Sequence, residues 1–147
     1  MSPRLPSITL ALSMAIAVMY PPAATAEDAS DPVFEAGQEW SIESGSGAKI
    51  VIGRVEDWRN EKAIHVSIVD IQVPPGLPRA GTMTQIAHAP FAYTALQGSV
   101  SKLLRTNVPP SSDFEAGYKQ WQDEHGGVFT ISAEEAIALM FKSLSGN

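Results

Sequence analysis

Cysteine is absent from all 147 residues of this sequence. Without thiols the chain can form no disulfide, and it also lacks the cysteine that carries the lipid of a bacterial lipoprotein. Small domains that work in an oxidising compartment usually rely on disulfides. We therefore expect a domain that carries no lipid and is held together by its hydrophobic core alone.

Positive charge is scarce. Ten Lys and Arg residues stand against sixteen Asp and Glu, which gives a formal net charge of −6 at pH 7. An acidic chain repels the phosphates of nucleic acids and the headgroups of anionic lipids. The charge therefore argues against nucleic-acid binding and electrostatic membrane binding, and it favours a cationic partner, such as a basic envelope or secreted protein.

Long hydrophobic runs are missing too. The apolar run Ile8–Val18 is shorter than the roughly 20 residues of a membrane-spanning helix, but it has the length of the apolar part of a signal peptide. Arg4 precedes this run, and Ala24–Ala26 follows it with the small-x-small pattern of a cleavage site. We predict a signal peptide over residues 1–26, cleaved after Ala26, and a periplasmic or secreted protein with no membrane anchor after cleavage. An uncleaved anchor is the less favoured alternative.

The remaining residues, 27–147, have the length of a single domain. Alternating apolar residues predict strands near Trp40 and over 49–58, 63–73 and 83–88, and a proline-rich loop over 74–81. Helices are predicted from Leu96 to about Asn107 and from Ser112 to Gly126, followed by a short strand over 128–131 and a last helix. Strands before helices predict an α+β fold, a largely antiparallel sheet of four or five strands packed by about three helices on one side.

The helical predictions depend on spacing and on capping signals. Leu96 begins an apolar series at i, i+4, i+7 and i+8, as on one face of a helix. Ser112 with Glu115, and Ser132 with Glu135, match the capping box that begins a helix. The residues expected in the core are Trp40, Ile50, Ile52, Ile64, Val66, Leu96, Leu103, Phe114, Trp121, Phe129, Ile137 and Phe141.

Motifs that specify a reaction or a cofactor are absent from the sequence. There is no G-x-S-x-G element, no glycine-rich phosphate loop and no closely spaced set of metal-ligating histidines. We therefore predict no cofactor and no metal site. Any catalytic site would have to be assembled by the fold from residues that lie apart in the sequence.

The three histidines are the first candidates for such a site. His65 alternates with Ile64 and Val66, which places it on the outer face of its strand. His88 precedes the first predicted helix and is either a buried histidine with its hydrogen bonds satisfied or a site residue. His125 falls at the end of a helix, where an imidazolium interacts favourably with the helix dipole, so its role is expected to be structural.

Paired carboxylates are the second candidates, because two acids can divide the work of acid–base hydrolysis. Glu56 and Asp57 lie beside Trp58, and an aromatic ring next to acids can hold a cation or a sugar. The simpler interpretation is a solvated hairpin end. The other acid pairs fall on exposed helix positions.

Two functions follow as hypotheses. The first, which we favour, is a small binding module without enzymatic activity, an inhibitor or immunity-type protein that acts on another envelope protein, with Trp58, His65 and His88 as its binding residues. The alternative is a small periplasmic hydrolase whose site consists of His65, His88 and Glu56 or Asp57. The distance between His65 and His88 distinguishes the two, because a shared cleft with a carboxylate would favour the enzyme.

Several short motifs, taken in order, resemble those of a family of small bacterial proteins to which no activity is attached. The resemblance covers most of residues 27–147 and implies a single compact domain, but no cofactor and no catalytic residue. Its motifs are Gly37-Gln38-Glu39-Trp40-Ser41, Ile64-His65-Val66, Ile86-Ala87-His88-Ala89-Pro90-Phe91, Phe114-Glu115-Ala116-Gly117-Tyr118-Lys119-Gln120-Trp121 and Gly127-Val128-Phe129-Thr130-Ile131.

The export prediction is tested by expressing the full chain in a Gram-negative host. We expect the protein in the periplasmic fraction with Glu27 as its first residue, because the small-x-small pattern directs cleavage after Ala26. Intact mass spectrometry of that fraction measures the terminus. A mass that still contains residues 1–26 would contradict the prediction.

Overall fold

The structure, a computed structural model, describes residues 30–72 and 84–144. The predicted signal peptide and the predicted loop over 74–81 lie outside these residues. Contacts divide the chain after Ser30, and every element described below belongs to the unit that begins at Asp31.

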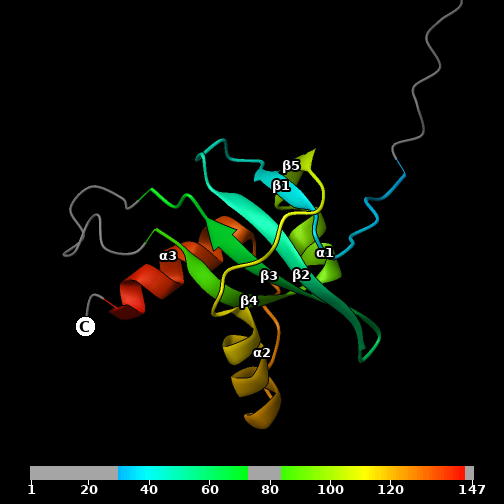
Figure 1. Ribbon diagram of the computed structural model, residues 1–147, viewed down its shortest axis with the longest axis vertical. Coiled ribbons are helices and arrows are strands. Elements are labelled where there is room, and N and C mark those ends of the chain that lie inside the picture. The colour runs from blue at the N-terminus through cyan, green and yellow to red at the C-terminus, as the bar shows by residue number, and fades with distance from the viewer. Residues whose placement is uncertain (1–29, 73–83, 145–147) are drawn as a thin grey trace, which may run out of the picture. The chain divides into compact units, whose positions relative to one another are not determined.

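A single antiparallel sheet of five strands forms the centre of this unit, in the order β4-β3-β2-β1-β5 (Figure 1). Three helices accompany the sheet, so the predicted α+β class, the antiparallel sheet and the number of helices are confirmed. The elements in chain order are β1 Glu39–Ile42, β2 Lys49–Trp58, β3 Glu61–Val69, β4 Ile86–Ala92, α1 Tyr93–Gln97, β5 Val100–Arg105, α2 Phe114–Asp123 and α3 Ala133–Leu144.

The long hairpin of β2 and β3 sets which side chains share a face. Trp58 pairs with Glu61, so the loop between the strands has two residues, and Arg59 takes the positive φ of 53° that such tight hairpin loops require. Pairing shifts by one residue between Ile52 and Arg54, which is a β-bulge. The bulge explains why Ile52 and Val55, three residues apart, can face the same core.

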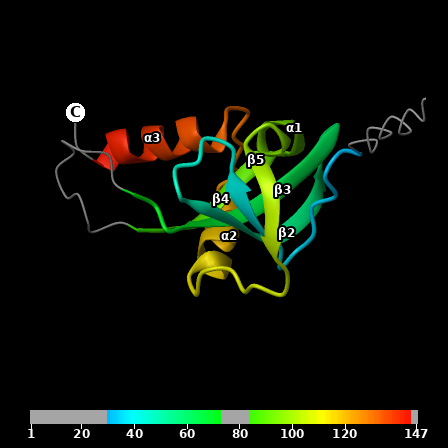
Figure 2. The ribbon, with the colours of Figure 1, turned by 90° about the horizontal axis from the view of Figure 1, so that it is seen from above.

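Helices cover both faces of the sheet. Buried residues of α1 and α3 join Ile64 and its neighbours in the main core, whereas α2 packs on the opposite face against β3 and β4 (Figure 2). The expectation that all helices lie on one side was therefore wrong. The second face of β3 carries His65 and Ser67, both buried polar residues, which are covered by α2 and by the loop that precedes it.

The predicted helix from Leu96 to Asn107 was also wrong. Helix α1 ends at Gln97, Gly98 follows it, and the chain continues as β5, which pairs with β1. The free edge of β1 offers backbone hydrogen bonds to an extended partner, and that pairing overrides the helical spacing of the leucines. Leu103 is consequently 38 % exposed and not a core residue. Four other expected core residues are only partly buried: Trp40, Trp121, Phe129 and Ile137.

Several predicted boundaries moved. The strand predicted over 63–73 is shorter, because β3 ends at Val69, Asp70 has a φ of 54°, and Ile71 turns back into the core. Strand β4 continues through Pro90, which is tolerated since the outer neighbour of β4 is one isolated bridge formed by Phe129. That bridge is all that forms of the predicted strand over 128–131.

The two predicted capping boxes had different outcomes. At α3 the box is confirmed, because the Ser132 backbone N–H donates to the Glu135 carboxylate and the Glu135 N–H donates to the Ser132 hydroxyl. Helix α2 begins at Phe114 after Asp113, and no side chain caps it. The box predicted for Ser112 and Glu115 was therefore wrong.

Gly53 of β2 and Phe114 of α2 lie in close contact. A Cβ atom placed on Gly53 would overlap the ring of Phe114, which is 1 % exposed. Replacing Gly53 with Ala should therefore lower the free energy of unfolding by about 1–3 kcal/mol, the usual cost of overpacking. Urea unfolding measures the change.

Gly98→Ala is the matched control. Gly98 has an ordinary helical φ of −74°, and an added Cβ would meet its nearest atom at 3.7 Å. This variant should be as stable as the original protein. Equal stability of the Gly53 and Gly98 variants would show that the Phe114 ring can shift to make room for the added Cβ at little cost. The packing of α2 on the sheet would then be looser than described.

Candidate functional site

His65 and His88, which lie on neighbouring strands, are hydrogen bonded to each other. His65 Nδ1 lies 2.9 Å from His88 Nε2, and the two rings stack nearly parallel at 16°. On the other side of the ring, His65 Nε2 lies 2.8 Å from Glu56 Oε1. The register of β2, β3 and β4 thus joins a carboxylate and two imidazoles in one continuous row.

The direction of these hydrogen bonds follows from the carboxylate. An ionised carboxylate only accepts hydrogen bonds, so His65 Nε2 donates its proton to Glu56. In a neutral imidazole the other nitrogen then accepts, so His88 Nε2 donates to His65 Nδ1. One nitrogen of the row, His88 Nδ1, is left with a free lone pair and is where the next proton binds.

Helix α2 completes the cluster from above. The Tyr118 hydroxyl donates to Glu56 Oε2 at 2.9 Å, and the Gln122 amide donates to the Tyr118 oxygen at 3.0 Å. Arg54 lies with its guanidinium 4.1 Å from the centre of the Tyr118 ring and forms an ion pair with Glu115 at 3.3 Å. Both oxygens of Glu56 are therefore engaged, one by the sheet and one by the helix.

Aromatic packing and glycine bring the helix this close. The Trp121 ring meets the His65 ring edge to face at 4.6 Å, and its indole N–H donates to the Gly127 carbonyl. Gly117 lies directly over β4, where an added Cβ would come within 2.6 Å of the Cβ of His88. Under this cover His65 has no exposed surface.

This burial corrects the sequence-based interpretation of His65. The alternation placed His65 and Ser67 on the face opposite Ile64, which is where they lie, but that face is covered by α2 and the loop before it. The Ser67 hydroxyl donates to the Ala87 carbonyl and accepts the Ser111 backbone N–H. Ser67 is thus fully used in holding this loop.

Burial sets the charge state of the two imidazoles. Burial lowers the pKa of His65, and the carboxylate of Glu56 opposes only part of that effect. Burial, together with the neighbouring His65, lowers the pKa of His88 to about 4. At neutral pH both rings are uncharged, as the donor and acceptor pattern above requires.

The remaining candidates lie apart from the cluster. Trp58 has the Arg59 guanidinium over its ring at 4.2 Å, and Asp57 is hydrogen bonded to Lys62 across the hairpin. His125 is exposed, follows α2 and has a positive φ of 51°, in keeping with its expected place at a helix end. Of the predicted residues, the structure brings together Glu56, His65 and His88.

Sequence reasoning missed the helical half of the cluster. Trp121 was expected only as a core residue, Tyr118 appeared only within a motif, and Arg54 and Gln122 were not singled out. The one available signal was the F-x-x-G-Y-x-x-W motif, whose Phe114, Gly117, Tyr118 and Trp121 all contact the sheet side of the cluster. A glycine within an amphipathic helix indicates a close approach to another element.

Chemically, the row can accept a proton at His88 Nδ1 and pass one on through His65 to Glu56.

Among the described residues, no cluster of three or more His, Asp or Glu side chains is arranged to hold a metal ion. Within residues 30–72 and 84–144, no helix is long and apolar enough to cross a membrane.

Acid should destabilise the fold through His88. A neutral histidine whose pKa falls on folding contributes stability above its unfolded pKa of about 6.5, and that contribution is lost as the pH falls toward the folded pKa of about 4. The loss over this range is on the order of 2–3 kcal/mol. Urea unfolding between pH 7 and pH 4 measures it.

His88→Gln is the test variant, because its amide can still donate to His65 Nδ1 but takes up no proton. Its stability should fall less steeply between pH 6.5 and 4 than that of the original protein. His125→Gln, at an exposed site, is the control and should leave the slope unchanged. An acid slope in the His88 variant equal to that of the original protein would refute the assignment.

Comparisons with protein-family models, with curated proteins and with solved structures gave no match. The family resemblance seen in the sequence motifs therefore stays a prediction, and the function has to be argued from the geometry of this chain alone.

Proposed function

We propose that this protein is an exported binding module, of the inhibitor or immunity type, that docks on a basic protein of the envelope or the exterior. The observation that carries the proposal is the closure of the histidine cluster. Where two histidines meet a carboxylate, the hydrogen-bonding groups of His65 and both oxygens of Glu56 are engaged by the chain's own side chains.

A general base must come within hydrogen-bond reach of the proton that it removes. His65 has no exposed surface, and both of its ring nitrogens are occupied by Glu56 and His88. Tyr118 and Trp121 lie over the same ring. The arrangement supports a structural role, in which the row of bonds fixes α2 on β2, β3 and β4.

Helix α2 and the residue that follows it carry three exposed carboxylates, Glu115, Asp123 and Glu124. Glu115 forms an ion pair with Arg54 and Asp123 with Lys119, whereas Glu124 forms no ion pair with a described residue. Opposite charge accelerates encounter and suppresses wrong partners. Together with the overall charge of −6, this favours a cationic partner.

The hydrolase remains the second candidate, because His65 is hydrogen bonded both to His88 and to the carboxylate of Glu56. The side chain of Glu56 is 31 % exposed, so a water molecule can reach its carboxylate. In this alternative Glu56 removes a proton from that water, while His65, itself hydrogen bonded to His88, holds the carboxylate in place. Asp57 takes no part, since it is bonded to Lys62 at the exposed hairpin.

The test is a pull-down from envelope extract with the exported protein as bait, at low salt and at about 0.5 M salt. We expect one basic protein in equimolar amount, lost at high salt because the charges that steer it are screened. A Glu115→Lys, Glu124→Lys bait should lose it, and a Glu134→Lys bait, altered on the other face of the sheet, should keep it.

The hydrolase is tested by incubating the protein with envelope polymers and comparing the original with Glu56→Gln and His88→Gln. No captured partner, together with product formation that both variants lose, would overturn the binding module. Capture of the partner by the His88 variant at neutral pH would support it.

A further inference from the structure

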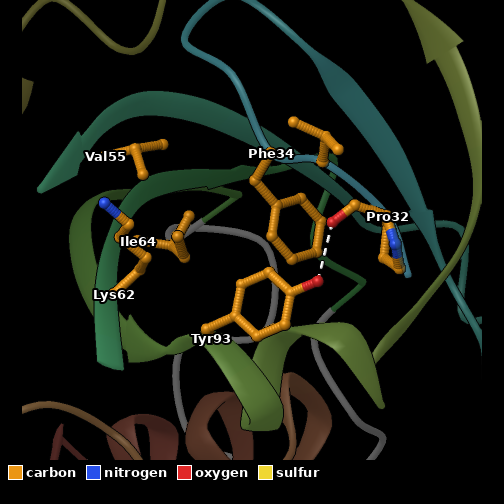
Figure 3. A pocket seen from close by; sticks show the side chains of 7 residues that line it. Pro32, Phe34, Val55, Lys62, Ile64 and Tyr93 are labelled. Carbon is orange, nitrogen blue, oxygen red and sulfur yellow. Dashed lines mark hydrogen bonds between the residues drawn. The ribbon is translucent and has the colours of Figure 1, made fainter. Parts of the chain in front are cut away.

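A half-open apolar pocket lies at one end of the core face, on the side of the sheet opposite the histidine cluster (Figure 3). Its base is the cross-strand pair Val55 and Ile64, and Ile64 has no exposed surface. Its walls are the rings of Phe34 and Tyr93, which meet edge to face at 5.4 Å. Pro32, Val33 and Lys62 complete the lining.

The pocket has the size of a single apolar group. Its volume is about 190 Å³, and an apolar cavity of about 150 Å³ is enough to bind one benzene ring. Its one hydroxyl, that of Tyr93, already donates to the Pro32 carbonyl at 2.9 Å. The walls therefore favour a leucine-sized or phenylalanine-sized group without polar atoms.

Acidic residues neighbour the lining of this pocket in the sequence. Asp31 and Glu35 flank residues 32–34 in the chain, and both are exposed. Glu61 precedes Lys62, the cation among the lining residues, whose ammonium is hydrogen bonded to the exposed carboxylate of Asp57. Acidic neighbours and a lysine whose charge is already paired disfavour an anionic ligand and favour a cationic one.

We propose that this pocket receives one apolar side chain of the partner protein, Leu or Phe in size, flanked in that partner by Lys or Arg. The inference rests on the proposed binding function and adds a second contact, on the core face of the sheet, to the one proposed for α2. A buried apolar anchor surrounded by a polar rim is the usual form of an interface hot spot. Val33, 72 % exposed beside the pocket, extends the apolar surface that the partner would cover.

Two blocked peptides test the pocket directly: acetyl-Lys-Lys-Leu-Lys-Lys-amide and the same peptide with Ser in place of Leu. The leucine peptide should bind at least about tenfold more tightly, because burying its side chain adds to the charge attraction that both peptides share. NMR titration of the exported protein measures both affinities, and the methyl signals of Val55 and Ile64 should move only with leucine. Equal affinities would overturn the inference. Hexanol serves as a free apolar probe: if the pocket signals respond to hexanol but not to the leucine peptide, the inference is also overturned.

Variants separate the apolar contact from the charge. Val55→Trp fills the pocket and should remove the preference for leucine, and Val33→Ser, at an exposed position that cannot unfold the core, should reduce it. Asp31→Asn with Glu61→Gln should weaken both peptides, whereas Glu124→Gln on α2 should weaken neither. A leucine preference that survives in the Val55 and Val33 variants would overturn the inference.

Capture of the partner by the original protein and by Val55→Trp tests the pocket inference separately from the proposed function. If a basic protein is captured equally by the original protein and by Val55→Trp, the binding function holds and the pocket inference fails. If no partner is captured but the leucine preference appears and is lost in Val55→Trp, the pocket is real and the proposed function fails.

Discussion

The buried imidazole of His65 is the constraint on which one whole side of the molecule depends. A side chain with no exposed surface and two polar nitrogens must find two partners inside the protein, since an unpaired buried nitrogen costs more than a hydrogen bond returns. Glu56 and His88 meet that demand from the strands on either side. Glu56 also accepts a hydrogen bond from Tyr118, so the carboxylate that pairs with His65 also helps to position α2.

The two faces of the sheet are thus stabilised by different physics. The face with α1 and α3 is a conventional apolar core built on isoleucines that have no exposed surface. The face with α2 combines aromatic rings with a hydrogen-bonded polar row, and a polar row of this kind is strong only while every member is satisfied. Protonation of the histidines therefore weakens the face with α2.

Periodicity alone was enough to predict the sheet and its class, because alternation in 49–58 and 63–69 is a local property of the chain. It was not enough for β5, where the spacing of Leu96, Leu103 and Leu104 fits a helix and only the distant edge of β1 decides otherwise. The histidine cluster could not be predicted either, because it too depends on contacts between segments that are distant in the sequence. Alternation assigned His65 to the right face, but nothing near it in the sequence shows that α2 covers that face.

The position of β1 between β2 and β5 has a consequence for the order of folding. The hairpin of β2 and β3 closes over a two-residue loop and can form early, while β1 and β5 meet only through residues as far apart as Ser41 and Ser101, separated by 60 positions. Closing so long a loop is slow, because its entropy is lost before any contact repays it. During synthesis the edge of β1 stays unpaired until β5 has left the ribosome, and this is the interval in which a chaperone would shield the nascent chain.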